Sequence, residues 1–184
     1  MKIIPSSEAT SAFSGFTTLW DMETKQAVRV YPMPGEVFLD AAFGPGDESV
    51  LAATVSGMIV QWDRETGSEI NRFMGHDGGV WSVTLSPDEN QIASSDDTGT
   101  IILWDLENGT ELRRHNAHNA LSFQVAFSPD GATVYSVSAD ETLAAWQVGD
   151  LSLSALLSWV ENNRYMRELT CGERAQYDIE PLCY

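Results

Sequence analysis

Long apolar runs, basic residues and cysteines are all scarce in this 184-residue chain. No strictly apolar run exceeds four residues, too few for a helix that spans a bilayer. The residues before Pro5 are too few for the apolar region of a signal peptide, so we expect a cytoplasmic protein. The two cysteines, Cys171 and Cys183, are expected to be free thiols in a reducing cytosol.

The charge of the chain is strongly one-sided, because 10 Lys and Arg face 27 Asp and Glu, for a net charge of −17. This balance excludes a partner that is bound through its phosphate backbone, and so nucleic acid. An apolar content of 43% is enough for a packed core of one domain. Many of the acids lie in expected turns, where they favour solvated faces; a basic protein partner is the alternative reading.

Tryptophan marks an internal repeat. Four of the six tryptophans are spaced by 42 residues each time, without insertion or deletion. The same offset separates residues of three further positions. The repeated sets are Trp20, Trp62, Trp104 and Trp146; Phe43, Leu85 and Phe127; Pro45, Pro87 and Pro129; and His76 with His118. One period shared by several residue types indicates four similar structural units.

Each unit has the pattern of a four-stranded antiparallel meander. In the third unit, apolar alternation predicts strands at 81–85, 92–95, the segment ending at Trp104, and 112–115, separated by turn residues. The turn before the last strand uses glycine in two units, whereas the first unit has Lys25 there, which we expect to be slightly strained. Such sheets must stack to bury both faces, and stacking around a central axis gives a β-propeller.

The Trp-Asp pairs that end the third strands, with Gly75-His76 before Trp104, resemble the WD-repeat family of β-propellers over roughly residues 8–149. Pro34 and Gln147 depart from the family pattern. The resemblance implies an all-β fold made of WD-repeat propeller blades, with the first and last of the four units incomplete. It also implies a protein-protein interaction scaffold that is not an enzyme.

In this family, a histidine, a serine or threonine, an aspartate and the tryptophan form a buried hydrogen-bond chain. The matching residues are His118, Ser138, Asp140 and Trp146 in the fourth unit and His76, Asp96 and Trp104 in the third. Ser, His and Asp are also the parts of an acyl-transfer triad, but no nucleophile elbow accompanies the serine. We interpret the set as structural, and no motif in the chain predicts a cofactor or a metal ion.

Binding surfaces of the family lie where the loop before the first strand meets the turn between the second and third strands. The resemblance therefore implies a protein or peptide partner at a set of loop and strand residues. They are Asp77, Gly78, Trp81, Asp97, Asn119, Phe123 and Ala139.

The two ends of the chain depart from the repeat. The first unit lacks its own first strand, and residues 1–12 match the repeat poorly. We expect propeller blades over 1–150 and a helical tail over 151–184, packed on the last blade, because Leu156, Leu157 and Val160 have helical spacing. The tail resembles the segment that closes WD-repeat regions of large bacterial multidomain proteins. An alternative function is therefore the C-terminal sensor or regulatory part of a larger bacterial signalling or defence protein, STAND-type or kinase-linked.

Four units do not readily close a propeller ring, since propellers use four to eight blades and these units are incomplete. Two solutions stay open. Upstream blades of a longer chain complete the ring, or a homodimer supplies eight blades.

Overall fold

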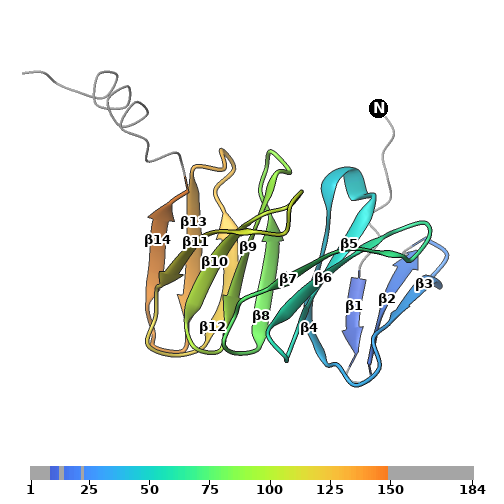
Figure 1. Ribbon diagram of the computed structural model, residues 1–184, viewed down its shortest axis with the longest axis horizontal. Coiled ribbons are helices and arrows are strands. Elements are labelled where there is room, and N and C mark those ends of the chain that lie inside the picture. The colour runs from blue at the N-terminus through green and yellow to red at the C-terminus, as the bar shows by residue number, and fades with distance from the viewer. Residues whose placement is uncertain (1–8, 13–14, 22, 149–184) are drawn as a thin grey trace, which may run out of the picture. The chain divides into compact units, whose positions relative to one another are not determined.

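The computed structural model describes residues 9–12, 15–21 and 23–148, and these residues form four antiparallel sheets (Figure 1). No helix among them is long and apolar enough to cross a membrane. The first sheet contains β1 (Ala9–Ala12), β2 (Phe16–Asp21) and β3 (Gln26–Pro32). The second contains β4 (Phe38–Phe43), β5 (Ser49–Thr54), β6 (Met58–Asp63) and β7 (Glu69–Met74), with a 3-10 turn η1 (Pro45–Asp47) after β4. The third contains β8 (Val80–Leu85), β9 (Gln91–Asp96), β10 (Thr100–Asp105) and β11 (Glu111–Asn116), and the fourth β12 (Ser122–Phe127), β13 (Thr133–Ser138) and β14 (Leu143–Gln147).

The repeat of 42 residues is a repeat of sheets, as predicted. In the two complete sheets the strands pair in chain order, and equivalent pairs keep the same register. Their middle strands are buried almost throughout, because they are covered on both faces. The fourth strands, β7 and β11, are largely exposed at the outer edge.

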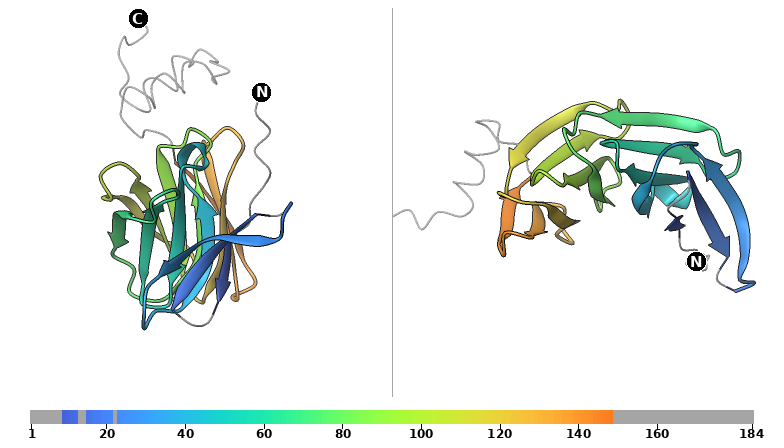
Figure 2. Two further views of the ribbon diagram at one scale, coloured as in Figure 1. Left: turned by 90° about the vertical axis from the view of Figure 1, so that its right-hand side faces the viewer. Right: turned by 90° about the horizontal axis from the view of Figure 1, so that it is seen from below.

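Successive sheets pack face to face within residues 9–148. Strand β4 contacts β8, and β8 contacts β12, so the first strands of consecutive sheets lie side by side on the inner side of the stack (Figure 2, right). One apolar cluster fills each of the three spaces between sheets, and a repeated tryptophan (Trp62, Trp104 or Trp146) contributes to each cluster.

The first and last sheets each have three described strands. Strand β1 pairs with β2 in the register that β5 has with β6, for Ala9 lies opposite Leu19 as Leu51 lies opposite Gln61. The described part of the first sheet thus begins at the equivalent of a second strand, and residues 9–12 follow the repeat more closely than their sequence suggested. The expected tail, its helices and both cysteines lie outside the described residues.

Two irregularities also repeat with the sheets. A left-handed backbone follows the third strand at Lys25, Gly67 and Gly109, with φ of 56°, 74° and 67°, so Lys25 adopts the strained conformation predicted for it. In addition, the pairing of the first strand with the second slips by one residue at Leu39, Trp81 and Phe123. Each of these three residues is a β-bulge on the inner strand.

Candidate functional site

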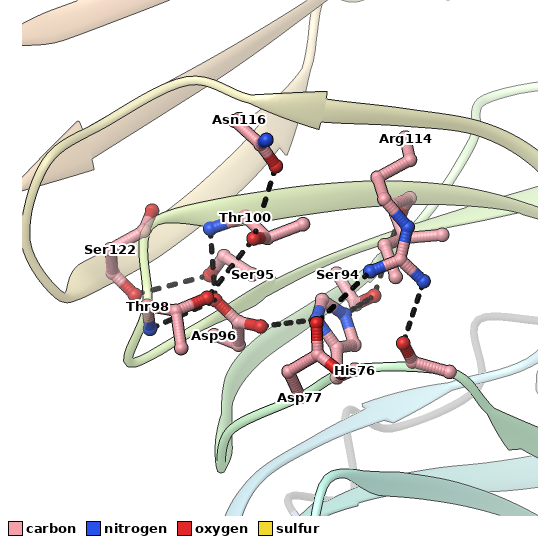
Figure 3. Close-up of polar contacts among 12 residues, drawn as sticks. His76, Asp77, Ser94, Ser95, Asp96, Thr98, Thr100, Arg114, Asn116 and Ser122 are labelled. Atoms are coloured by element: carbon pink, nitrogen blue, oxygen red, sulfur yellow. Dashed lines mark hydrogen bonds and ion pairs between the residues drawn. The ribbon is translucent and has the colours of Figure 1, made fainter.

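A buried polar chain ties together the strands of the third sheet (Figure 3). The hydroxyl of Ser94 on β9 lies 2.7 Å from His76 Nε2 and accepts a hydrogen bond from Trp104 Nε1 at 2.8 Å. His76 Nδ1 in turn lies 2.8 Å from Asp96 Oδ2. The structure therefore brings together His76, Asp96 and Trp104, which were matched to one chain in the sequence, through a serine that was not.

Asp96 holds the turn between β9 and β10 with its second oxygen. Asp96 Oδ1 accepts hydrogen bonds from the hydroxyl and N–H of Thr98 and from the N–H of Thr100. Burial alone would raise the pKa of this carboxyl, but the hydrogen bonds from His76, Thr98 and Thr100 hold its pKa below the usual value. Asp96 is thus a carboxylate whose lone pairs are used within the protein.

The Ser94, His76 and Asp96 side chains have the order of a catalytic triad, but the side chains of His76 and Asp96 are completely buried, as is Ser94. A hydrolytic serine must reach a substrate carbonyl, and a completely buried hydroxyl cannot do so. The geometry favours a structural chain that satisfies buried polar groups.

The fourth sheet forms a different chain from the one expected. His118 Nε2 lies 2.7 Å from Ser136, not Ser138, and its Nδ1 lies 2.7 Å from the Thr142 hydroxyl, with Asp140 Oδ1 at 3.5 Å. The Ser138 hydroxyl donates to backbone carbonyls of the loop before β12 instead. The assignment of Ser138 was wrong. Alternation along β13 places Ser136 and Ser138 on the same face of the sheet, and of the two it is Ser136 that lies level with the His118 ring.

Trp146 also differs from the expectation. Its Nε1 is buried and has no hydrogen-bond partner among the described residues, whereas Trp104 donates to Ser94. The repeat contained the signal for the correct serine, since Ser94 and Ser136 are 42 residues apart and each precedes its tryptophan by ten. In the second sheet, Ala52 and Pro34 occupy the serine and histidine positions, so the same side-chain chain cannot form there.

The residues expected to bind a partner lie at one end of the sheets, drawn at the lower edge of Figure 1 and hereafter called the lower end. The lower end consists of the loops before β4, β8 and β12 and the turns that follow β5, β9 and β13. The loop before β8 meets the turn after β9, since a Cβ on Gly78 would lie 1.7 Å from Asp97 Oδ1, and the Asp97 N–H donates to Gly79 O. A side chain at position 78 would therefore require the exposed Asp97 side chain to move.

The same junction recurs in the fourth sheet through backbone groups. The N–H of Asn119 donates to Asp140 Oδ2 at 2.9 Å, and the N–H of Ala139 donates to Leu121 O. The Thr142 hydroxyl and the Asn119 N–H lower the pKa of Asp140, which is therefore ionised at neutral pH. The structure thus brings Asn119 and Ala139 into one loop cluster.

The two aromatic residues of the predicted set, Trp81 and Phe123, are the bulge residues of β8 and β12. A bulge turns an additional side chain out of the normal alternation. Trp81 remains 38% exposed and Phe123 53%, although both lie on the inner strands of packed sheets. Because β8 and β12 are neighbours, the bulges place two exposed aromatic side chains in one row beside the loops of the lower end.

The loops of the lower end are acidic. Glu36, Asp77, Asp97, Asp140 and Glu141 occur in residues 33–37, 55–57, 75–79, 97–99, 117–121 and 139–142, which contain no Lys or Arg. Arg114 on β11 lies 3.9 Å from the exposed Asp77 carboxylate but is paired with Glu111 at 2.8 Å.

No group of three metal-binding side chains occurs in the part of the chain that the structure describes. An open pocket lies at the opposite end, between the second and third sheets, and is lined by Pro45, Ile70, Asp88 and Leu106 among others. None of the seven predicted binding residues lines that pocket.

Comparison with protein families agrees with this architecture. The family model described as WD domain, G-beta repeat matches residues 67–105 and 109–147, each match ending at the third strand of a sheet. No curated protein matches the chain. Residues 67–105 and 109–147 are therefore WD repeats, and the sheets that repeat every 42 residues and the buried histidine chain are consistent with part of a WD-repeat propeller.

Proposed function

We propose that the chain is a non-catalytic scaffold that binds a partner protein at the lower end of its sheets. WD repeats generally serve protein-protein interaction. The observation that carries the placement is the pair of bulged, exposed aromatics, Trp81 and Phe123, on neighbouring inner strands. Exposed aromatic side chains on a rigid sheet lose little conformational entropy on binding and are common anchors of interfaces.

The charge around these aromatics supports a basic partner. Asp77 and Asp97 are exposed in the loops next to Trp81, and the ionised Asp140 lies in the turn after β13, in the loop cluster next to Phe123. A Lys or Arg side chain can pair with these carboxylates and lie over an aromatic ring at the same time. The partner segment is then basic and carries apolar side chains between its cations.

Absence of catalysis is part of the proposal and is supported by the buried polar chain. The serine and histidine that have the order of a nucleophile and a base are inaccessible in the third sheet. The exposed end of the sheets offers carboxylates and aromatics, which suit recognition better than acyl transfer.

The test measures binding of fluorescent peptides from a library in which Lys or Arg alternates with apolar residues, with a library of Asp and Glu as the reference. The full chain is compared with Trp81→Ala and with the double variant Asp77→Asn, Asp97→Asn. The double variant Glu65→Gln, Glu107→Gln is the matched control, because it removes two exposed acids from the opposite end. We expect at least a tenfold loss for Trp81→Ala, a loss that falls with added salt for the double variant, and no change for the control.

Two results would contradict the proposal. Binding to the acidic library alone would exclude a basic partner. Equal losses in the lower-end variant and in the matched control would show that net charge, rather than this surface, determines binding.

A further inference from the structure

The stack of sheets ends in two faces that no described residue covers. We call the face of a sheet that packs on the preceding sheet its leading face, and the face that packs on the following sheet its trailing face. The repeated tryptophans lie on leading faces, because Trp62, Trp104 and Trp146 contact the sheets before them. The leading face of the first sheet and the trailing face of the fourth lie at the two ends of the stack.

The trailing face of the fourth sheet is apolar and bulkier than its counterparts. Tyr135, Val137 and Leu143 are exposed, with Leu143 at 67%, and their equivalents in the third sheet, Ala93, Ser95 and Ile101, are completely buried against the fourth. Ser95 donates a hydrogen bond across that contact to Ser122 O at 3.2 Å. Val137 replaces the donor with an apolar side chain.

A second change on this side concerns a turn glycine. A Cβ on Gly57 would lie 3.0 Å from carbonyls of the loop before β8, and a Cβ on Gly99 would lie 2.6 Å from a carbonyl of the loop before β12. Glu141 occupies the equivalent position of the fourth sheet, with φ of 67°. The loop before the first strand of a following sheet would collide with the Glu141 side chain. The trailing face of the fourth sheet therefore fits a neighbouring sheet that lacks this loop.

The leading face of the first sheet has lost its polar contacts as well. In the third sheet, Arg114 pairs with Glu111. It also donates a 2.6 Å hydrogen bond to Gly75 O, in the segment that connects the second sheet to the third. Val30 and Ala27 stand at these two positions in the first sheet. Trp20 is 37% exposed, whereas Trp104 is 1% exposed beneath its neighbouring sheet.

We propose that the two end faces bind each other in a pair of copies of this chain, the leading face of one copy on the trailing face of the other. In both end faces, apolar side chains stand where the third sheet has side chains that form polar contacts with its neighbours. Two apolar faces can therefore pack on each other without leaving a buried polar group unpaired. The first sheet has described strands equivalent only to the second, third and fourth of a complete sheet, so its described part presents no loop against Glu141 of the other copy.

The pairing accounts for both exposed faces with one partner. Two copies related by a twofold axis make the same contact twice, so that neither face stays open. Together they supply eight sheets, which is within the four to eight blades that propellers use. The inference is independent of the partner proposed for the lower end.

The experiment measures the solution mass of residues 1–184 by light scattering after size exclusion, over a series of concentrations. We expect a species of twice 20.2 kDa that dissociates on dilution. Leu143→Glu on the trailing face and Val30→Glu on the leading face should each weaken the dimer more than tenfold. Leu112→Glu is the matched control, since Leu112 is 48% exposed on the outer strand β11 and lies on neither end face.

Mixing the two variants tests the head-to-tail arrangement. One of the two contacts in a mixed dimer joins unaltered faces, so the mixture should associate more strongly than either variant alone. A chain that stays at 20.2 kDa at every concentration overturns the proposal and leaves another segment of the chain, or a different protein, as the cover of the faces. A dimer that Val30→Glu leaves intact also overturns it, because the faces would then pair like with like.

Discussion

The third and fourth sheets contain the same histidine and serine positions but use them differently. In the third, Ser94 serves both His76 and the Trp104 indole, and the whole chain is buried between two neighbouring sheets. In the fourth, Ser136 serves His118, while the Trp146 indole N–H has no partner among the described residues. The comparison shows that the same histidine and serine positions bond to different partners in consecutive repeats.

The aspartates of the two chains also differ. Asp96 lies on the end of β9 and bonds His76 directly, whereas Asp140 lies in a turn and reaches its histidine mainly through Thr142. Asp96 is 42 residues before Ser138, so the two aspartates are not equivalent in the repeat. Two local solutions thus fix the same turn, one with a completely buried carboxylate and one with a carboxylate that is partly exposed.

The largest expected effect is the loss of Ser94. Ser94→Ala leaves both the Trp104 N–H and His76 Nε2 without a buried partner and should lower the free energy of unfolding by about 2–4 kcal/mol. Ser136→Ala leaves only His118 Nε2 unpaired and should cost about 1–2 kcal/mol. Urea unfolding of both variants at equal protein concentration measures the difference. Equal losses would mean that the Trp104 bond adds nothing to stability.

The fold was largely predictable from the sequence because a period of 42 residues, alternating apolar positions and turn residues all agree. The polar chain was predictable in its types of residue and only partly in their positions. Ser94 and Ser136 were overlooked because serine occurs at several positions on each second strand, and only the pairing register decides which one faces the histidine. No pattern of residues within a single repeat indicates the bulges at Trp81 and Phe123.

The turn after the second strand provides the next prediction, of intermediate size. Gly99→Ala introduces a Cβ 2.6 Å from His118 O at φ of 86° and should cost about 2 kcal/mol. Glu141→Gly removes a side chain from a left-handed position and should instead stabilise the fourth sheet by about 1 kcal/mol. Thermal unfolding of both variants tests the opposite signs. A loss of stability in Glu141→Gly would show that its side chain makes a contact that outweighs the backbone strain.

The smallest effect separates the two aspartates by pH. The pKa values of Asp96 and Asp140 are both lowered in the folded protein, so each carboxylate contributes stability that is present above the unfolded pKa of about 4. As the pH falls from there through the folded pKa, protonation removes that contribution, and stability decreases. Asp140→Asn should therefore be less stable than the natural chain at pH 7, and the difference should shrink below pH 4. At pH 7, Asp96→Asn should lose more stability than Asp140→Asn, because the Asp96 carboxylate is buried beside His76. The stability difference between Asp96→Asn and the natural chain should also shrink below pH 4. Urea midpoints at pH 7, 4 and 3 measure both differences, and a difference that stays constant across this range would mean that the carboxylate charge contributes nothing to either turn.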